Sequence, residues 1–351
     1  MPDYALCPAS MMNVDDTGLL AEQVRTGDRA ALGRAITLIE SKRSDHEAVA
    51  QDLLHNLLPD TGNAVRLGMT GMPGAGKSTL IEALGGRLTS QGHKVAVLAV
   101  DPTSQRTGGS ILGDKTRMTR LSVDDNAFIR PSPAGATLGG VARRTRETML
   151  VCEAAGNDVI IVETVGIGQS ETTVAAMVDF FAVVQVAGAG DELQGIKKGV
   201  LEIADLIIVN KADGDNLKRA NQAVGEYRAA LHILTPANPL WQPQVLAVSA
   251  LKGGGLDELW RIVKDHRAIL SDAGALAEKR RDQQVGWMWS LLEDRLKLAV
   301  KRHPALASRL PDLEAAVRGG TLTPTAAVNQ VTAALGLDTE PVLSARSDQA
   351  E

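Results

Sequence analysis

The segment from Gly71 to Ser78 has the residue types and spacing of a phosphate-binding loop. Its sequence, GMPGAGKS, places Gly, Gly, Lys and Ser at every fixed position of the Walker A motif. The glycines allow backbone N–H groups to wrap phosphates, the lysine reaches the β and γ oxygens, and the serine hydroxyl can ligate Mg²⁺. The residues predicted to bind nucleotide here are Gly74, Ala75, Gly76, Lys77, Ser78 and Thr79, and Lys77 is also a catalytic candidate.

A second motif, Asn210-Lys-Ala-Asp213, has the N-K-x-D pattern that reads guanine in GTPases. The Asp213 carboxylate would accept from both N1–H and the exocyclic amine of guanine, and Lys211 would cover the base. Adenine lacks this donor pair and would leave the carboxylate unpaired, at a cost of about 1–3 kcal/mol. A later apolar run ends in Ser249, Ala250 and Leu251, where a backbone N–H can meet guanine O6. The order of these segments favours guanine over adenine.

Two carboxylates are candidates for holding Mg²⁺ together with Ser78. Glu163 follows the apolar run 158–162, and Asp101 follows the run 94–100. Open α/β sheets bind ligands at the ends of such strands, and carboxylate oxygens suit Mg²⁺. Gly166, three residues after Glu163, could sense the γ-phosphate through its amide. For either carboxylate taken alone, a merely solvated side chain is the alternative.

The motifs need a sheet to position them, and the sequence predicts one. Short apolar runs alternate with helical stretches, which indicates a largely parallel sheet covered by helices on both faces. The seven predicted strands are 64–70, 94–100, 127–130, 158–163, 179–186, 205–210 and 244–249. The chain is therefore predicted to be an α/β protein.

Helical patterns flank this region on both sides. Before residue 60 the apolar residues recur at helical spacing, with Asp45 expected as the N-cap of one helix. A long helix is predicted from about Ala273 to His303, and Thr323 is expected to cap a later helix that starts at Pro324. Trp287 and Trp289 lie near the middle of the long helix.

Composition excludes several classes of protein. The chain has 351 residues and a net charge of −5, so it carries no overall basic field for nucleic acid. Its two cysteines cannot form a disulfide framework, and no basic, apolar leader precedes the helices. No stretch has 18 uncharged apolar residues. We expect a cytoplasmic protein that binds neither nucleic acid nor membrane.

Four longer segments resemble the family of MeaB-type P-loop GTPases, to which the cobalamin A complementation protein belongs. They are 101–118 (DPTSQRTGGSILGDKTRM), 129–132 (IRPS), 163–171 (ETVGIGQSE) and 188–199 (GAGDELQGIKKG). The resemblance covers roughly residues 28 to 335. It implies a chaperone that hydrolyses GTP to GDP with Mg²⁺ and gates adenosylcobalamin loading into a B12-dependent acyl-CoA mutase. The mutase, not this chain, would hold cobalamin stably.

Residue roles also follow from the resemblance. Switch I would be 101–114, switch II 163–171, and a third switch 190–198 would relay contact with the mutase. The family's pattern assigns catalysis to Asp114 and partner-stimulated hydrolysis to Lys197. It implies a homodimer, with an adenosyltransferase as a further candidate partner. The expected segments are a disordered leader at 1–12, an N-terminal helical bundle at 13–60, the GTPase domain at 61–270, a C-terminal helical dimerisation arm at 271–337 and a disordered tail at 338–351.

Two other functions remain open from the sequence. One is a metal-delivery GTPase, although such proteins usually carry Cys pairs or His-rich tracts, and the cysteines here, Cys7 and Cys152, are isolated. The other is a P-loop small-molecule kinase with Arg143, Arg144 and Arg146 on a lid, which the N-K-x-D motif argues against. A preference for GTP over ATP would exclude the kinase.

Overall fold

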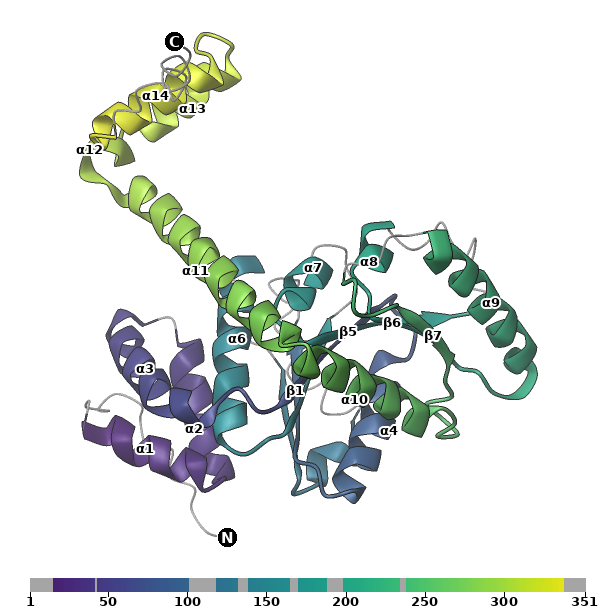
Figure 1. Cartoon of the computed structure of the whole chain (residues 1–351). Coiled ribbons are helices and arrows are strands. Elements are labelled where there is room, and N and C mark those ends of the chain that lie inside the picture. Colours follow the sequence, from purple (N-terminus) through teal and green to yellow (C-terminus); the bar gives the residue numbers. More distant parts are fainter. Residues whose placement is uncertain are drawn as a thin grey trace, which may run out of the picture. The chain divides into compact units, whose positions relative to one another are not determined.

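The computed structural model describes residues 15–41, 43–100, 118–131, 138–164, 170–187, 198–233 and 238–337. Its centre is a seven-stranded sheet in the order β3-β2-β4-β1-β5-β6-β7, in which every neighbouring pair is parallel (Figure 1). The strands are β1 Val65–Gly71, β2 Val95–Val100, β3 Ala127–Pro131, β4 Val159–Thr164, β5 Phe180–Val186, β6 Leu206–Asn210 and β7 Gln244–Ala247. The predicted α/β fold with a parallel sheet is confirmed.

Helices cover both faces of the sheet because the strands are apolar on both. Alternate residues of each strand face opposite ways, so Leu67 and Met69 of β1 join one buried cluster, while Ile160 and Val162 of β4 join the other. The first cluster includes residues of α4 (Lys77–Ser90) and α10 (Leu256–Asp272). The second includes residues of the helices α6 (Leu138–Ala154), α7 (Ser170–Ala175), α8 (Lys198–Glu202) and α9 (Leu217–Ile233).

Three N-terminal helices pack on the second face, mainly against α6 (Figure 1). They are α1 (Asp15–Arg25), α2 (Arg29–Glu40) and α3 (Ser44–Leu57). The Asp28 carboxylate caps α2 by accepting from the Ala31 amide at 2.7 Å. The prediction of Asp45 as an N-cap is wrong. The N-cap of α3 is Arg43, and Asp45 lies in the first turn, where it forms an ion pair with Arg43.

The chain divides into two compact units, residues 1–284 and 285–351. The predicted long helix is confirmed as α11 (Ala275–Arg302). Three short helices follow, α12 (Pro304–Ala307), α13 (Leu310–Arg318) and α14 (Pro324–Ala334). Thr323 caps α14 as predicted, because its hydroxyl accepts from the Ala326 amide at 3.3 Å. None of the helices in the described ranges is long and apolar enough to cross a membrane.

The strand order places the end of β1 at the centre of one edge of the sheet. From β1 the chain runs to β2 and β3 on one side, then returns through β4, and crosses β1 to reach β5. Strand order reverses next to β1, which is where open α/β sheets bind ligands beyond the carboxyl ends of their strands. The carboxyl ends of β1, β4 and β6, with the segments that follow them, contain most of the predicted site residues.

Candidate functional site

The phosphate loop is shaped by glycines that no other residue could replace without strain. At Gly71, φ is 150°, and an added Cβ would lie 2.1 Å from the Val184 carbonyl oxygen of β5. At Gly76, φ is 83°, and an added Cβ would lie 2.7 Å from Nδ2 of Asn210. Gly76 is also the N-cap of α4 and supplies no side-chain cap. The amides of the first turn therefore remain donors for an anion.

Lys77 and Thr79 lie in this first turn of α4. The Lys77 ammonium group donates to the carbonyl oxygens of Gly71 at 2.7 Å and Met72 at 3.2 Å, and its side chain is largely buried. The loop thus holds a positive charge beside its own backbone, close to the helix N-terminus. Phosphate oxygens are negatively charged, so both the ammonium group and the helix N-terminus would attract them.

Ser78 and Glu163 come together from different elements. The Ser78 hydroxyl donates to Oε1 of Glu163 at 3.0 Å, and Glu163 is buried near the end of β4. A hydroxyl and a carboxylate are hard oxygen ligands, the kind that Mg²⁺ prefers. The donor set fits a magnesium ion bound together with nucleotide phosphates. These two residues would hold that ion, which would neutralise charge on the transferred phosphoryl group.

Asn210 connects the phosphate loop to the segment predicted to meet the base. From the end of β6, its side-chain amide donates to the Ala75 carbonyl oxygen at 2.9 Å. Its Oδ1 accepts from the Ala250 amide at 3.2 Å. Because Asn210 is buried, both hydrogen bonds are shielded from water. One side chain therefore fixes the phosphate loop and the segment predicted to read the base relative to each other.

The other residues predicted to read the base lie beside Asn210. The Ser249 hydroxyl donates to Asp213, and Ser249 Oγ accepts from the Lys252 amide at 3.0 Å. Lys211 adopts φ 59°, the sole positive φ of a non-glycine residue within the described ranges. A left-handed lysine costs free energy and commonly marks a functional site. The Asn216 side chain stabilises this turn by donating to the Lys211 carbonyl oxygen at 2.9 Å.

The structure brings together most of the predicted nucleotide-binding residues. The phosphate loop, Ser78 with Glu163, and Asn210 with Ala250 form one connected set at the carboxyl edge of the sheet. Strand β7 ends at Ala247, two residues earlier than predicted, and Ser249 instead bridges to Gly254. The side chain of Leu251 is 77% exposed. Four predicted site residues lie outside the described residues: Asp101, Asp114, Gly166 and Lys197.

Sequence reasoning missed some residues that support the site. It assigned Asn210 to the base and did not predict its contact with Ala75, which is 135 residues away in the chain. It also missed Asn216, whose amide holds the strained turn at Lys211. The only available signal was an asparagine shortly after the N-K-x-D motif, and many surface turns contain one.

A parallel sheet with a phosphate loop after its central strand, a Ser–carboxylate pair and an N-K-x-D turn defines a P-loop GTPase. The family model described as methylmalonyl-CoA mutase-associated GTPase MeaB matches residues 32–305. The chain therefore belongs to the MeaB family of GTPases.

Relatives match over nearly the whole chain. A Caulobacter vibrioides protein is 58% identical over 322 residues, which are 92% of this chain and 98% of that protein. The mouse mitochondrial methylmalonic aciduria type A homolog is 45% identical over 308 residues, 85% of this chain and 74% of its own. A solved structure of a LAO/AO transport system kinase is 41% identical, with a TM-score of 0.76, and covers 93% of this chain and 100% of its own.

Proposed function

We propose that this chain is a GTP-hydrolysing chaperone of an adenosylcobalamin-dependent acyl-CoA mutase, of the methylmalonyl-CoA mutase kind. It would gate loading of the cofactor and protect or reactivate the mutase, while the acyl-CoA chemistry stays with the partner. The observation that carries the proposal is the match of residues 32–305 to a family described by its association with methylmalonyl-CoA mutase. The phosphate loop and the base-reading turn, joined by Asn210, support GTP as the nucleotide.

In this proposal each group at the carboxyl edge has one task. Lys77 and the first-turn amides of α4 bind the β- and γ-phosphates, and Asp213 accepts from the guanine edge. Ser78 and Glu163 would hold Mg²⁺, which would supply positive charge beside the transferred phosphoryl group. Asp101 is proposed as a further metal ligand, and Gly166 as the amide that senses the γ-phosphate. Asp114 is proposed to act in hydrolysis and Lys197 in its stimulation by the mutase.

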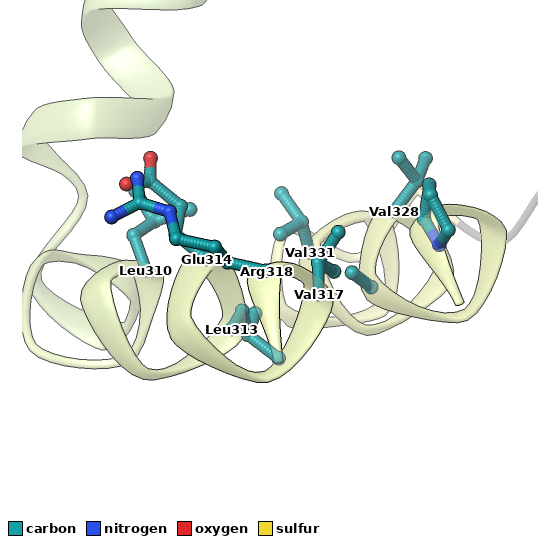
Figure 2. A pocket seen from close by; sticks show the side chains of 9 residues that line it. Leu310, Leu313, Glu314, Val317, Arg318, Val328 and Val331 are labelled. Carbon is teal, nitrogen blue, oxygen red and sulfur yellow. The ribbon is translucent and has the colours of Figure 1, made fainter. Parts of the chain in front are cut away.

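We further propose a homodimer formed by the C-terminal unit. On α11 the residues Val285, Trp289, Leu292 and Leu296 are spaced by four, three and four, and each side chain is 41–55% exposed. This is the a/d spacing of a coiled-coil seam, which is normally buried against another helix. Figure 2 shows a second apolar surface in the same unit, where α13 and α14 line a cavity of about 480 Å³ with Leu310, Leu313, Val317, Val328 and Val331.

The dimer can be tested on the seam itself. A double variant in which Glu replaces both Leu292 and Leu296 would place like charges on the seam. We expect this variant to be a monomer when measured by sedimentation velocity. The matched control replaces Glu293 and Lys297 with Gln, since neither residue belongs to the seam. If the Glu variant still sediments as a dimer, the seam is not the interface.

The chaperone function is tested by measuring GTP hydrolysis by the purified protein, alone and with an adenosylcobalamin-dependent acyl-CoA mutase. ATP serves as the control nucleotide, and the mutase alone gives the background. Stimulation of GTP turnover by the mutase, with ATP inert, would support the proposal. If no cobalamin-dependent mutase changes the rate of GTP hydrolysis, the protein is still a GTPase, but the chaperone function is contradicted. Metal analysis of the purified protein would then test the metal-delivery alternative.

A further inference from the structure

Two buried threonine hydroxyls meet where β1 and β4 end. Thr70 precedes the phosphate loop, Thr164 follows Glu163, and both side chains are 0% exposed. The Thr164 hydroxyl donates to Oγ1 of Thr70 at 2.7 Å, so the proton of Thr70 is free to be donated onward. Its acceptor is Oε1 of Glu171 in α7, at 3.5 Å. The result is a chain of two hydrogen bonds from β4 through β1 to α7, of which the first is short and the second is long.

A close approach of α7 to β1 makes the last of these contacts possible. An added Cβ at Gly68 would lie 2.8 Å from Phe181 of β5, 2.9 Å from Val178 and 3.1 Å from Val174, so the absence of a side chain helps α7 and the turn after it to pack closely on β1. Gly68 and Thr70 are two residues apart on a strand and share one face of the sheet. Glu171 and Val174 are three apart on α7 and share one face of the helix. Val174 therefore packs over Gly68 while Glu171 reaches Thr70.

The opposite face of β4 carries the predicted metal ligand. Successive residues of a strand point to opposite faces, so Glu163 points toward α4, where it meets Ser78, and Thr164 points toward α7. A shift of the backbone at Thr164 would also move the backbone of Glu163, because the two residues share one peptide bond. Likewise, Thr70 is joined by a peptide bond to Gly71, which begins the phosphate loop.

We propose that Thr70 is a positioning residue for GTP hydrolysis, coupling α7, through Glu171, to the phosphate loop and to Glu163. Its hydroxyl holds the ends of β1 and β4 in one register while Glu171 fixes α7 against them. Loss of the hydroxyl misplaces Glu163 relative to Ser78, and displacements on the order of 1 Å can lower the rate about 100-fold. The proposal rests on the GTPase activity of the proposed function and does not depend on which mutase is the client.

The test is Thr70→Val, which keeps the branched shape of the side chain and replaces the hydroxyl with a methyl group. The measurements are kcat and KM for GTP, the affinities for GDP and for a non-hydrolysable GTP analogue, and the melting temperature. Thr70→Ser keeps the hydroxyl and serves as the rescue. Thr148→Val is the matched control, because Thr148 is a buried threonine of α6 whose hydroxyl has no hydrogen-bond partner among the described residues.

We expect Thr70→Val to lower kcat by about tenfold or more, the loss that one buried hydrogen bond represents. Its GDP affinity should change less than its affinity for the GTP analogue, and Thr70→Ser should recover most of the rate. Equal kcat in Thr70→Val and wild type would overturn the proposal. So would a Thr70→Ser variant as slow as Thr70→Val, since packing of the methyl group would then explain the loss. A wild-type protein that does not hydrolyse GTP would contradict the proposed function instead.

Glu171 provides a second route if Thr70→Val does not fold. It is partly exposed, so Glu171→Ala leaves the buried hydroxyl pair in place. We expect Glu171→Ala to lower kcat and Glu171→Gln, which retains an acceptor oxygen, to recover it. Equal rates in Glu171→Ala and wild type would show that α7 is not coupled to the site through this contact, and would also overturn the proposal.

Discussion

The two edges of the central sheet use charged and polar residues in opposite ways. At the amino edge, the Asp179 carboxylate before β5 receives two hydrogen bonds from Arg280 of α11, at 2.8 and 2.7 Å. The Arg66 amide adds a third at 3.0 Å, and the Arg66 side chain forms an ion pair with Glu153 at 2.6 Å. Here the chain satisfies its buried charges with its own side chains.

At the carboxyl edge, the polar groups are arranged around a phosphate loop. Gly76 supplies no side-chain cap to α4, and Lys211 is held in a left-handed conformation. Both features cost stability, and both suit a bound nucleotide. The difference teaches that one edge stabilises the fold and anchors α11, while the other is specialised for a ligand. Substitutions at the two edges should therefore affect different measurements.

The largest expected effect is the loss of stability caused by a substitution at the amino edge. Asp179→Asn breaks the buried pair with Arg280 and should lower the free energy of unfolding by about 3–5 kcal/mol. Urea unfolding measures this loss, and the preference of the folded variant for GTP over ATP should not change. The matched control is Asp257→Asn, which breaks an ion pair with Arg87. The side chains of Arg87 and Asp257 are 51% and 68% exposed. That change should cost far less than Asp179→Asn, because solvent screens an exposed ion pair. Equal losses in the two variants would contradict the comparison.

Next in size is a change on the carboxyl edge. Lys77→Ala removes the loop's positive charge and should weaken GTP binding by about 100-fold or more, which corresponds to about 3 kcal/mol. Calorimetric titration with GTP measures this affinity. The free energy of unfolding of the nucleotide-free Lys77→Ala protein should fall by less than that of the Asp179→Asn protein. Unchanged GTP affinity would mean that the assignment of the phosphate loop is wrong.

A smaller effect is expected from two opposed titrations at the amino edge. Burial raises the pKa of Asp205 to about 6, partly offset by the charge of Lys279. Burial, together with the same charge, lowers the pKa of His266 to about 4, so this imidazole is neutral at pH 7. Asp205 therefore contributes stability at low pH that is lost as the pH rises through 6. His266 contributes stability above pH 6.5 that is lost as the pH falls toward 4. The two contributions oppose each other in this window.

The Asp205→Asn variant tests this opposition at a carboxyl whose Oδ1 lies 3.7 Å from Nε2 of His266. Asn keeps an acceptor for the Phe181 amide, which Asp205 binds at 2.8 Å, and removes the carboxyl titration. The free energy of unfolding of the variant should then fall more steeply than that of the wild type between pH 6.5 and 4. The additional fall should be about 1–3 kcal/mol. Urea unfolding at several pH values checks the slope. Parallel profiles for the two proteins would rule out Asp205 as the opposing group.

Sequence patterns predicted the strands better than the contacts between them. The interior of β6, Leu206 to Val209, is uniformly apolar because helices cover both faces, and such a run identifies a central parallel strand directly. Ser78 and Glu163 could be paired in advance because Mg²⁺ chemistry requires oxygen ligands near the phosphate loop. Local periodicity and known chemistry thus gave the fold and the centre of the site.

Contacts over long sequence distances were not predictable in this way. Asp179 and Arg280 are 101 residues apart, and no local pattern distinguishes them from solvated surface charges. The Thr70–Thr164 contact depends on β1 and β4 being neighbours, which only the strand order establishes. Asp45 shows that local sequence also fails to fix the first residue of a helix. An acidic residue is favourable both at an N-cap and in the first turn.

The most direct test of the account is the nucleotide preference of the Asp213→Asn variant. In the proposed function, guanine would present N1–H and an amine to the Asp213 carboxylate. Xanthine has a carbonyl oxygen in place of that amine, which would accept from an Asn amide. Competition binding with GTP, XTP and ATP measures the preference. The account predicts that GTP affinity falls by roughly 5- to 150-fold, or about 1–3 kcal/mol, while XTP affinity rises. A variant that remains strictly selective for GTP would contradict the claim that this turn reads the base.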